Sequence, residues 1–114
     1  ITKKIHNINF VYLIAENYPN QFLKQFIDDQ KNKFNTKCIA LIISKNNEKL
    51  SLILGATSDL INEFDCSSNI REISNLLGGN GGGGRKDLAQ AGGCDFSKIN
   101  HALDLIQKKI SDLI

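Results

Sequence analysis

The chain has 114 residues, of which 41% are hydrophobic and 23% are charged, and its formal net charge is +2. This length allows one domain with a buried core, and the composition is that of a soluble globular protein. The small net charge permits an RNA partner without requiring one, because electrostatic binders usually carry a stronger basic excess. No segment reaches the roughly 18 apolar residues of a membrane-spanning helix, so we expect no membrane partner.

A strand and then a helix are predicted at the start of the chain. Residues 5–15 contain a run of β-branched and aromatic residues that is typical of a strand. Pro19 and Asn20 open the helix. Its apolar residues are spaced for one helical face: Phe22, Leu23, Phe26, Ile27 and Phe34. Its charged residues fall largely on the other side: Asp28, Asp29, Lys31 and Lys33.

Two further strands are predicted in the middle of the chain. The apolar run at 39–43 is too short for a helix and indicates a central strand that is buried on both faces. Turn-forming residues at 45–48 and a second apolar run at 50–54 form a hairpin that ends at Gly55. Residues 58–64 fit a short helical turn.

The second half of the chain predicts two helices and a short strand. Asn69 and Glu72 fit a capping box at the start of the first helix, and the pair Gly78–Gly79 ends it. Residues 87–90 fit the short strand, and Ser97 caps the last helix. The two apolar stripes comprise Ile70, Ile73, Leu76 and Leu77, and then Ile99, Leu103, Ile106, Ile110 and Leu113.

These elements predict an α/β fold. The order is strand, helix, hairpin, helix, glycine-rich loop, last strand and last helix. A long crossover and a hairpin together imply a small mixed sheet, flanked by about three helices. The glycine-rich loop comes before the last strand and the last helix.

Eight of the nine glycines lie between residues 78 and 93, in the sequence GGNGGGGRKDLAQAGG. Glycine loses more backbone freedom on folding than any other residue, so such a stretch needs a reason. Either the backbone needs positive φ angles, or another molecule must approach the peptide groups closely. Successive exposed N–H groups form a concave site that suits phosphate, and Arg85 and Lys86 add positive charge at the same place.

Two known nucleotide-binding motifs do not fit the glycine stretch. A Walker loop requires Lys and then Ser or Thr after its last glycine, whereas Arg85 and Lys86 stand there. A dinucleotide fingerprint at Gly79, Gly81 and Gly84 would have to follow a strand, but here it follows a helix. Two structural alternatives stay open: a flexible linker, and a tight loop that packs against the last helix.

The same stretch closely resembles the signature near the C-terminus of alanine–tRNA ligases. That family has two glycines, a basic residue, three glycines, Arg or Lys, Pro, Asp, an apolar residue and then AQAGG or AQGGG. The segment 50–60 resembles the strand that leads to the family's "VSKD" segment, and 28–31 resembles its "DDLK" helix. Three departures stand out: Asn80 replaces the basic residue, one glycine is extra (Gly83 or Gly84), and Lys86 replaces proline.

The resemblance implies a domain of the DHHA1 type, shared with DHH phosphoesterases and RecJ-like exonucleases. In those enzymes the glycine motif commonly ends in His, where Arg85 stands here. In the synthetase branch the domain is expected to contact the elbow of alanine-specific tRNA, so that the aminoacylation and editing sites share one tRNA. The parent enzyme would be cytoplasmic and would use ATP, magnesium and, in its editing domain, zinc. No cofactor is expected for these 114 residues.

We therefore expect residues 1–114 to be a single C-terminal tRNA-binding domain of a longer synthetase, whose remaining chain is a further partner. The chain opens with Ile rather than Met, which favours a fragment. The expected RNA-binding residues are Gly79, Asn80, Gly81, Gly82, Gly83, Gly84, Arg85, Lys86 and Gln90. No catalytic or metal-binding residues are expected, because the two histidines, His6 and His101, stand alone and the three cysteines, Cys38, Cys66 and Cys94, are scattered reduced thiols.

Two other functions stay open. The chain fits an interaction domain that forms homodimers through an apolar stripe on the last helix or an unpaired sheet edge. It also fits the substrate-binding half of a DHH-type phosphodiesterase, although the missing His argues against this alternative.

Overall fold

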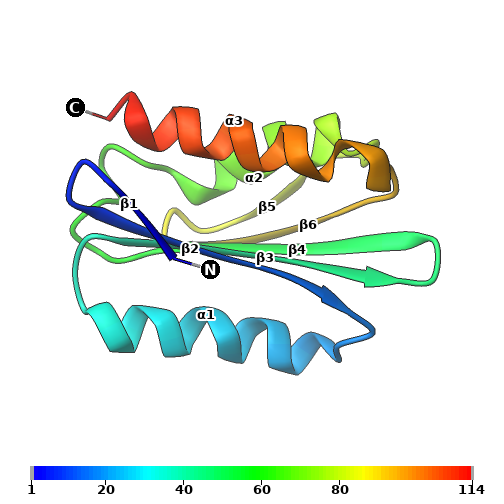
Figure 1. Cartoon of the computed structure of the whole chain (residues 1–114), viewed down its shortest axis with the longest axis horizontal. Coiled ribbons are helices and arrows are strands. Elements are labelled where there is room, and N and C mark those ends of the chain that lie inside the picture. The colour runs from blue at the N-terminus through cyan, green and yellow to red at the C-terminus, as the bar shows by residue number, and fades with distance from the viewer. Residues whose placement is uncertain (1, 114) are drawn as a thin grey trace.

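A computed structural model describes residues 2–113 and has three layers, with helix α1 on one face of a sheet and helices α2 and α3 on the other (Figure 1). The strands are β1 (Thr2–Ile5), β2 (Ile8–Glu16), β3 (Cys38–Asn46), β4 (Lys49–Ala56), β5 (Gly82–Gly84) and β6 (Leu88–Gly93). The helices are α1 (Asn20–Phe34), α2 (Cys66–Leu76), the short 3-10 helix η1 (Phe96–Lys98) and α3 (Ile99–Ser111). The predicted α/β fold is confirmed.

The sheet is mixed, with the strand order β1-β2-β3-β4-β6-β5. Strands β2 and β3 are parallel and are joined by the α1 crossover, whereas the other neighbouring pairs of the described sheet are antiparallel. The predicted hairpin joins β3 to β4. Every residue of β3 from Cys38 to Ser44 is buried, so the predicted central strand is confirmed.

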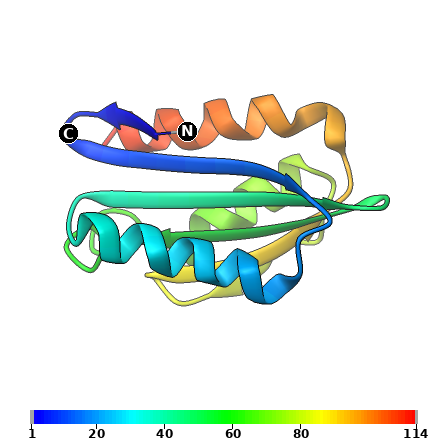
Figure 2. The ribbon, with the colours of Figure 1, turned by 60° about the horizontal axis from the view of Figure 1, so that its bottom comes forward.

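Alternation along β3 divides the core into two parts. Ile39, Leu41 and Ile43 face α2 and α3, whereas Cys38, Ala40 and Ile42 face α1. Helix α1 packs over β3 and β4, and α2 packs against β5 and β6 on the opposite face. As a result, α1 leaves the β5–β6 side of its own face uncovered (Figure 2).

Both predicted helix caps were wrong. Asp65 caps α2 by accepting a hydrogen bond from the Ser67 backbone N–H at 2.9 Å, and Asn69 lies inside the helix with its side chain donating to the Asp65 carbonyl. Ser97 lies within η1, where Asp95 accepts from its backbone N–H at 3.1 Å. In each case an aspartate a few residues upstream is the better acceptor for the free N–H groups of the first turn.

Two predicted strands differ from the observed ones. The run at 5–15 is interrupted by a turn with positive φ at His6 (49°) and Asn7 (69°), which separates β1 from β2. The strand predicted at 87–90 extends to Gly93, and the segment predicted as a loop contains a strand, β5, made only of glycine. Residues 58–64 form successive hydrogen-bonded turns, close to the predicted helical turn.

Candidate functional site

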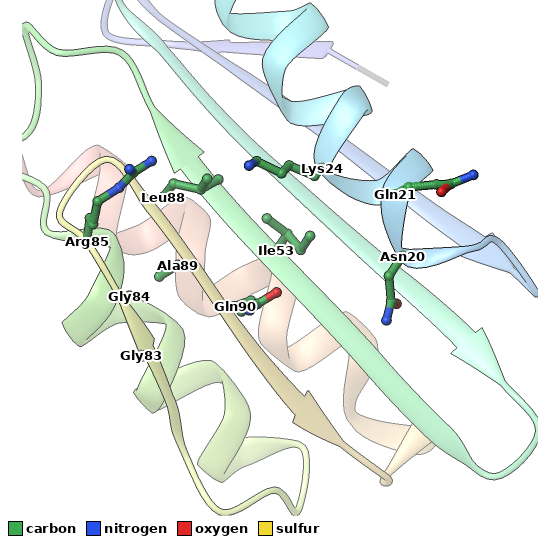
Figure 3. A pocket seen from close by; sticks show the side chains of 10 residues that line it. All are labelled: Asn20, Gln21, Lys24, Ile53, Gly83, Gly84, Arg85, Leu88, Ala89 and Gln90. Atoms are coloured by element: carbon green, nitrogen blue, oxygen red, sulfur yellow. The ribbon is translucent and has the colours of Figure 1, made fainter.

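A hollow of about 450 Å³ opens where α1 leaves the sheet uncovered, between the first half of α1 and the strands β5 and β6 (Figure 3). The residues that line it are Asn20, Gln21, Lys24, Ile53, Gly83, Gly84, Arg85, Leu88, Ala89 and Gln90. Helix α1 forms one side, and the β5–β6 hairpin forms the other. The hollow is the main concave feature beside the glycine stretch.

The floor of the hollow is the sheet itself. Gln90 pairs with Ile53 of β4 on one side and with Gly83 of β5 on the other, so all three positions point to the α1 face. Leu88 packs beside the α1-side core. Because Gly83 has no side chain, and a Cβ there would meet no atom within 4 Å, the floor is open toward the edge of the sheet.

Two cationic side chains reach over this floor from opposite sides. Lys24 extends from α1 and Arg85 from the turn after β5, and they point toward one another with Leu88 between them (Figure 3). No carboxylate is among the described residues that line the hollow. Just outside it, the Asp87 carboxylate forms an ion pair with Arg85, in which Nε lies 3.2 Å from Oδ1 and the arginine side chain stays 71% exposed.

The turn that carries Arg85 is anchored by three donors from three different elements. Lys31 of α1 donates through Nζ to the Asp87 carbonyl at 2.7 Å, and the Ala56 N–H donates to the same oxygen at 3.1 Å. The Cys66 N–H donates to the Lys86 carbonyl at 2.9 Å. These bonds fix the backbone of the turn at Lys86 and Asp87, next to Arg85, whose side chain is 71% exposed.

Four of the nine sequence-predicted binding residues lie together at the hollow: Gly83, Gly84, Arg85 and Gln90. The others lie outside it: Gly79, Asn80, Gly81, Gly82 and Lys86. Lys86 instead interacts electrostatically with Asp65, the N-cap residue of α2. The pKa of Asp65 is lowered, chiefly because the Ser67 hydroxyl donates to its carboxylate, and the charge of Lys86 contributes to the same shift. Arg85 and Lys86, grouped by the sequence, thus act in different surroundings.

The glycines divide in the same way. A Cβ on Gly79 would meet Ser74 and the Gly92 carbonyl, and a Cβ on Gly82 would meet Ala91. Glycine is needed at these two positions because the backbone there packs directly against β6 and, at Gly79, also against α2. The tight-loop alternative placed the glycines against the last helix, and this partner was wrong, because Gly79 and Gly82 contact β6 and α2.

Sequence reasoning missed the contribution of α1 to this surface. Asn20, Gln21 and Lys24 line the hollow, and Lys31 was placed on the outer face although its side chain is only 19% exposed. Lys24 and Lys31 are seven residues apart, which puts them on one stripe of the helix. That spacing was the available signal, and it marks the flank of α1 that borders β4 and β6.

The described residues include no group of three or more His, Cys, Asp or Glu side chains that could hold a metal ion. The thiols of Cys38 and Cys66 are buried, and burial raises their pKa values to about 11 and about 12. Within residues 2–113, no helix combines the length and the apolar character needed to cross a lipid bilayer.

The family model of the DHHA1 domain matches residues 7–112. The chain belongs to the DHHA1 domain family. It is 36% identical over 108 residues to the alanine–tRNA ligase of Rhodopseudomonas palustris, a match that covers 95% of this chain and 12% of that protein. It is 32% identical over 105 residues to the alanine–tRNA ligase of Rickettsia bellii, which covers 92% of this chain and again 12% of the relative. This DHHA1 domain thus spans about an eighth of the length of these curated relatives.

Among solved structures, the C-Ala domain of Aquifex aeolicus alanyl-tRNA synthetase matches with a TM-score of 0.90 and 26% identity, covering 97% of this chain and 98% of that one. The resemblance to the C-terminal domain of alanine–tRNA ligases is confirmed. A DHH domain protein described as a member of the s1p family of ribosomal proteins matches with a TM-score of 0.65 and 14% identity, over 97% of this chain and 27% of that one. This second likeness shows the fold alone and gives no support to the phosphodiesterase alternative.

Proposed function

We propose that this DHHA1 domain is a non-catalytic tRNA-binding module of an alanine–tRNA ligase. In this proposal it holds the elbow of alanine-specific tRNA, so that the aminoacylation and editing sites can share one tRNA. The longer synthetase is cytoplasmic and binds its ATP, magnesium and zinc outside this domain. The observation that carries the proposal is the hollow beside the glycine stretch, which has Lys24 and Arg85 at its rim and no carboxylate among its described lining residues.

This surface suits RNA for physical reasons. Folded RNA is recognised mainly through shape, phosphates and 2′-hydroxyls, and arginine binds phosphate through two parallel hydrogen bonds. Because the net charge is only +2, we expect weak binding by the isolated domain, with a dissociation constant on the order of 10⁻⁴ to 10⁻⁶ M at physiological salt. The bare backbone at Gly83 allows a phosphate or ribose to approach the sheet edge closely.

The test is a titration of this domain with full-length alanine tRNA and, in parallel, with an acceptor-stem minihelix that lacks the D loop. Two variants accompany it. Arg85→Ala removes a cation from the hollow, and Lys49→Ala removes an exposed cation at the start of β4, outside the hollow. Both variants lose one positive charge, so a non-specific charge effect would weaken both equally.

The proposal predicts that full-length tRNA binds more tightly than the minihelix, that affinity falls with added salt, and that Arg85→Ala weakens binding more than Lys49→Ala does. Equal binding of the two RNAs, or no binding at physiological salt, would contradict an elbow-binding role for the domain on its own.

Homodimer formation remains the second candidate. The apolar stripe of α3 is unavailable for it, because its residues pack in the core: Ile99, Leu103, Ile106 and Ile110 are buried. The exposed large hydrophobic side chains of the described chain are instead Tyr18 (46%) and Phe22 (54%), at the start of α1. Their exposure favours an apolar contact at this corner. Gel filtration at micromolar concentration tests it, and a monomer peak that does not shift with concentration would exclude it.

A further inference from the structure

We infer that the hollow between α1 and the β5–β6 hairpin is a subsite for one unpaired nucleotide, with its phosphate held between Lys24 and Arg85 and its base over Leu88 and Ile53. The inference deepens the proposed RNA-binding function, on which it rests. It also makes α1 part of the binding surface, and it assigns Lys24 as a binding residue.

The hollow has the size of a small-ligand site. A volume of about 450 Å³ falls in the range of small-ligand pockets, roughly 300 to 1,000 Å³. One side of the hollow is a helix and the other is a hairpin, and the sheet floor between them is open toward the sheet edge at Gly83 (Figure 3). A nucleotide that has left its helix fits this description, whereas the convex side of an RNA duplex does not.

The hollow carries two cations and no carboxylate among its described lining residues. Lys24 makes no ion pair or side-chain hydrogen bond with any described residue, and the ion pair of the Arg85 Nε with Asp87 leaves the arginine side chain 71% exposed. The two terminal nitrogens of the guanidinium therefore remain available as donors. Two cations that point toward one another across an open space repel, and an anion placed between them removes the repulsion. Phosphate fits both, as the arginine supplies a fork and the lysine a point charge.

The floor of the hollow offers both apolar and amide groups to a base. Leu88 and Ile53 offer apolar side chains to the face of a base, while Asn20 and Gln90 offer amide donors and acceptors to its edge. A smaller hollow of about 210 Å³ continues along the same face, shares Asn20, Ile53 and Gln90 with the first, and adds Ser51. With its phosphate between Lys24 and Arg85, the nucleotide would place its base toward this second, more polar hollow.

The experiment follows amide chemical shifts of the ¹⁵N-labelled domain during titration with uridine 5′-monophosphate, with a single-stranded oligouridine, and with an RNA duplex of the same length. Shifts are expected at Leu88, Ala89 and Gln90 and in the first half of α1. Lys24→Gln is expected to weaken binding of the monophosphate and the single strand roughly threefold to fivefold, as for one exposed charge contact. Lys33→Gln, on the other flank of the same helix, is the matched control.

A second variant tests the space without changing a charge. A Cβ at Gly83 would meet no neighbouring atom, so Gly83→Leu is expected to fold and to block the floor, with a similar loss of affinity. Its circular dichroism spectrum and melting temperature check the fold.

The outcomes separate the inference from the proposed function. If tRNA binds and Arg85→Ala weakens it, but Lys24→Gln matches Lys33→Gln and the monophosphate shifts no residue of the hollow, the subsite is wrong and the tRNA role stands. If the monophosphate titrates the hollow but tRNA does not bind, the subsite stands and the tRNA role fails. An oligouridine that binds more tightly than the monophosphate identifies an RNA strand as the ligand, whereas equal affinity identifies a free nucleotide. Tighter binding of the duplex overturns the inference.

Discussion

A Cβ atom on Gly84 would lie 2.6 Å from the Leu88 carbonyl oxygen, and one on Gly82 would meet Ala91, whereas one on Gly83 would meet nothing within 4 Å. The register explains the difference: Gly82 and Gly84 pair with the inward-facing Ala91 and Ala89, and Gly83 pairs with the exposed Gln90. The neighbouring glycines of β5 therefore have different roles. Two permit close packing, and the third leaves the hollow open.

This difference predicts opposite effects for two alanine substitutions. Gly82→Ala should lower the free energy of unfolding by about 1 to 3 kcal/mol, because the added methyl group overpacks the contact with Ala91. Gly83→Ala should be neutral or stabilising by about 0.4 to 1 kcal/mol, because it reduces the freedom of the unfolded chain. Urea unfolding of both variants measures this. Equal destabilisation would mean that β5 tolerates no side chain at all.

The three thiols should also differ. Cys38 and Cys66 are buried, with pKa values raised to about 11 and about 12, whereas Cys94 is exposed. Because the thiolate is the reactive form, iodoacetamide at pH 8 should label Cys94 alone in the native protein. Mass spectrometry after brief labelling counts the modified cysteines, and a urea-unfolded sample, in which all three should react, is the control. Rapid native labelling of Cys38 or Cys66 would contradict the packing of the core.

At the scale of elements, the turn after β5 depends on partners that are distant in sequence. Lys31, Ala56 and Cys66 come from α1, β4 and the start of α2, and together they bind the carbonyls of Lys86 and Asp87. Gly55 makes this possible, because a Cβ there would lie 3.1 Å from the Lys31 Cε and would also meet Ile27. The aliphatic part of the Lys31 side chain thus lies over β4 at Gly55, where no side chain blocks it.

We predict that Lys31→Met, which keeps the apolar stem but removes the ammonium, lowers the free energy of unfolding by about 1.5 to 3 kcal/mol, as expected for a lost hydrogen bond to a charged donor. Because the Ala56 and Cys66 donors remain, the turn should loosen locally, with faster amide exchange at Arg85. Urea unfolding and amide exchange by NMR are the measurements, with Lys33→Met as the control. Unchanged exchange at Arg85 would show that the two backbone donors suffice.

The elements that sequence could predict are those with a strong local pattern. The continuous apolar run of β3 and the apolar stripe of α3 are buried as expected, because the spacing of apolar residues in the sequence already indicates which face must pack in the core. Strand β5 was not predictable, since glycine has no strand preference and β5 exists only through pairing with β6. The caps failed because Asn69 and Glu72 have the right spacing but Asp65 is closer to the true start. Arg85 and Gln90 were found from a motif, whereas Lys24 required knowledge of how α1 crosses the sheet.

At the scale of the whole molecule, the two faces of the sheet are covered unequally. Two helices close one face, and α1 lies over β3 and β4 on the other (Figures 1 and 2). The strands at the two ends of the sheet, β1 and β5, are also the shortest, with four and three residues. The hollow lies near the β5 end, where the least protein covers the sheet.

This arrangement predicts a gradient of local stability. Hydrogen exchange should be slowest in β3, which is buried and paired on both sides, and fastest in β1 and β5, which have one neighbour each. Exchange followed by mass spectrometry over minutes to hours measures it. Protection in β5 equal to that in β3 would indicate a further partner at the free edge of β5.

The three donors that bind the turn after β5, on Lys31, Ala56 and Cys66, all precede that turn in the sequence. The apolar core beneath α1 is likewise built from residues 11–53 and Leu88, with no residue of α3. A ribosome that has released the chain as far as Gln90 has therefore already supplied every group of the hollow, while the opposite face still lacks the helix that will close it.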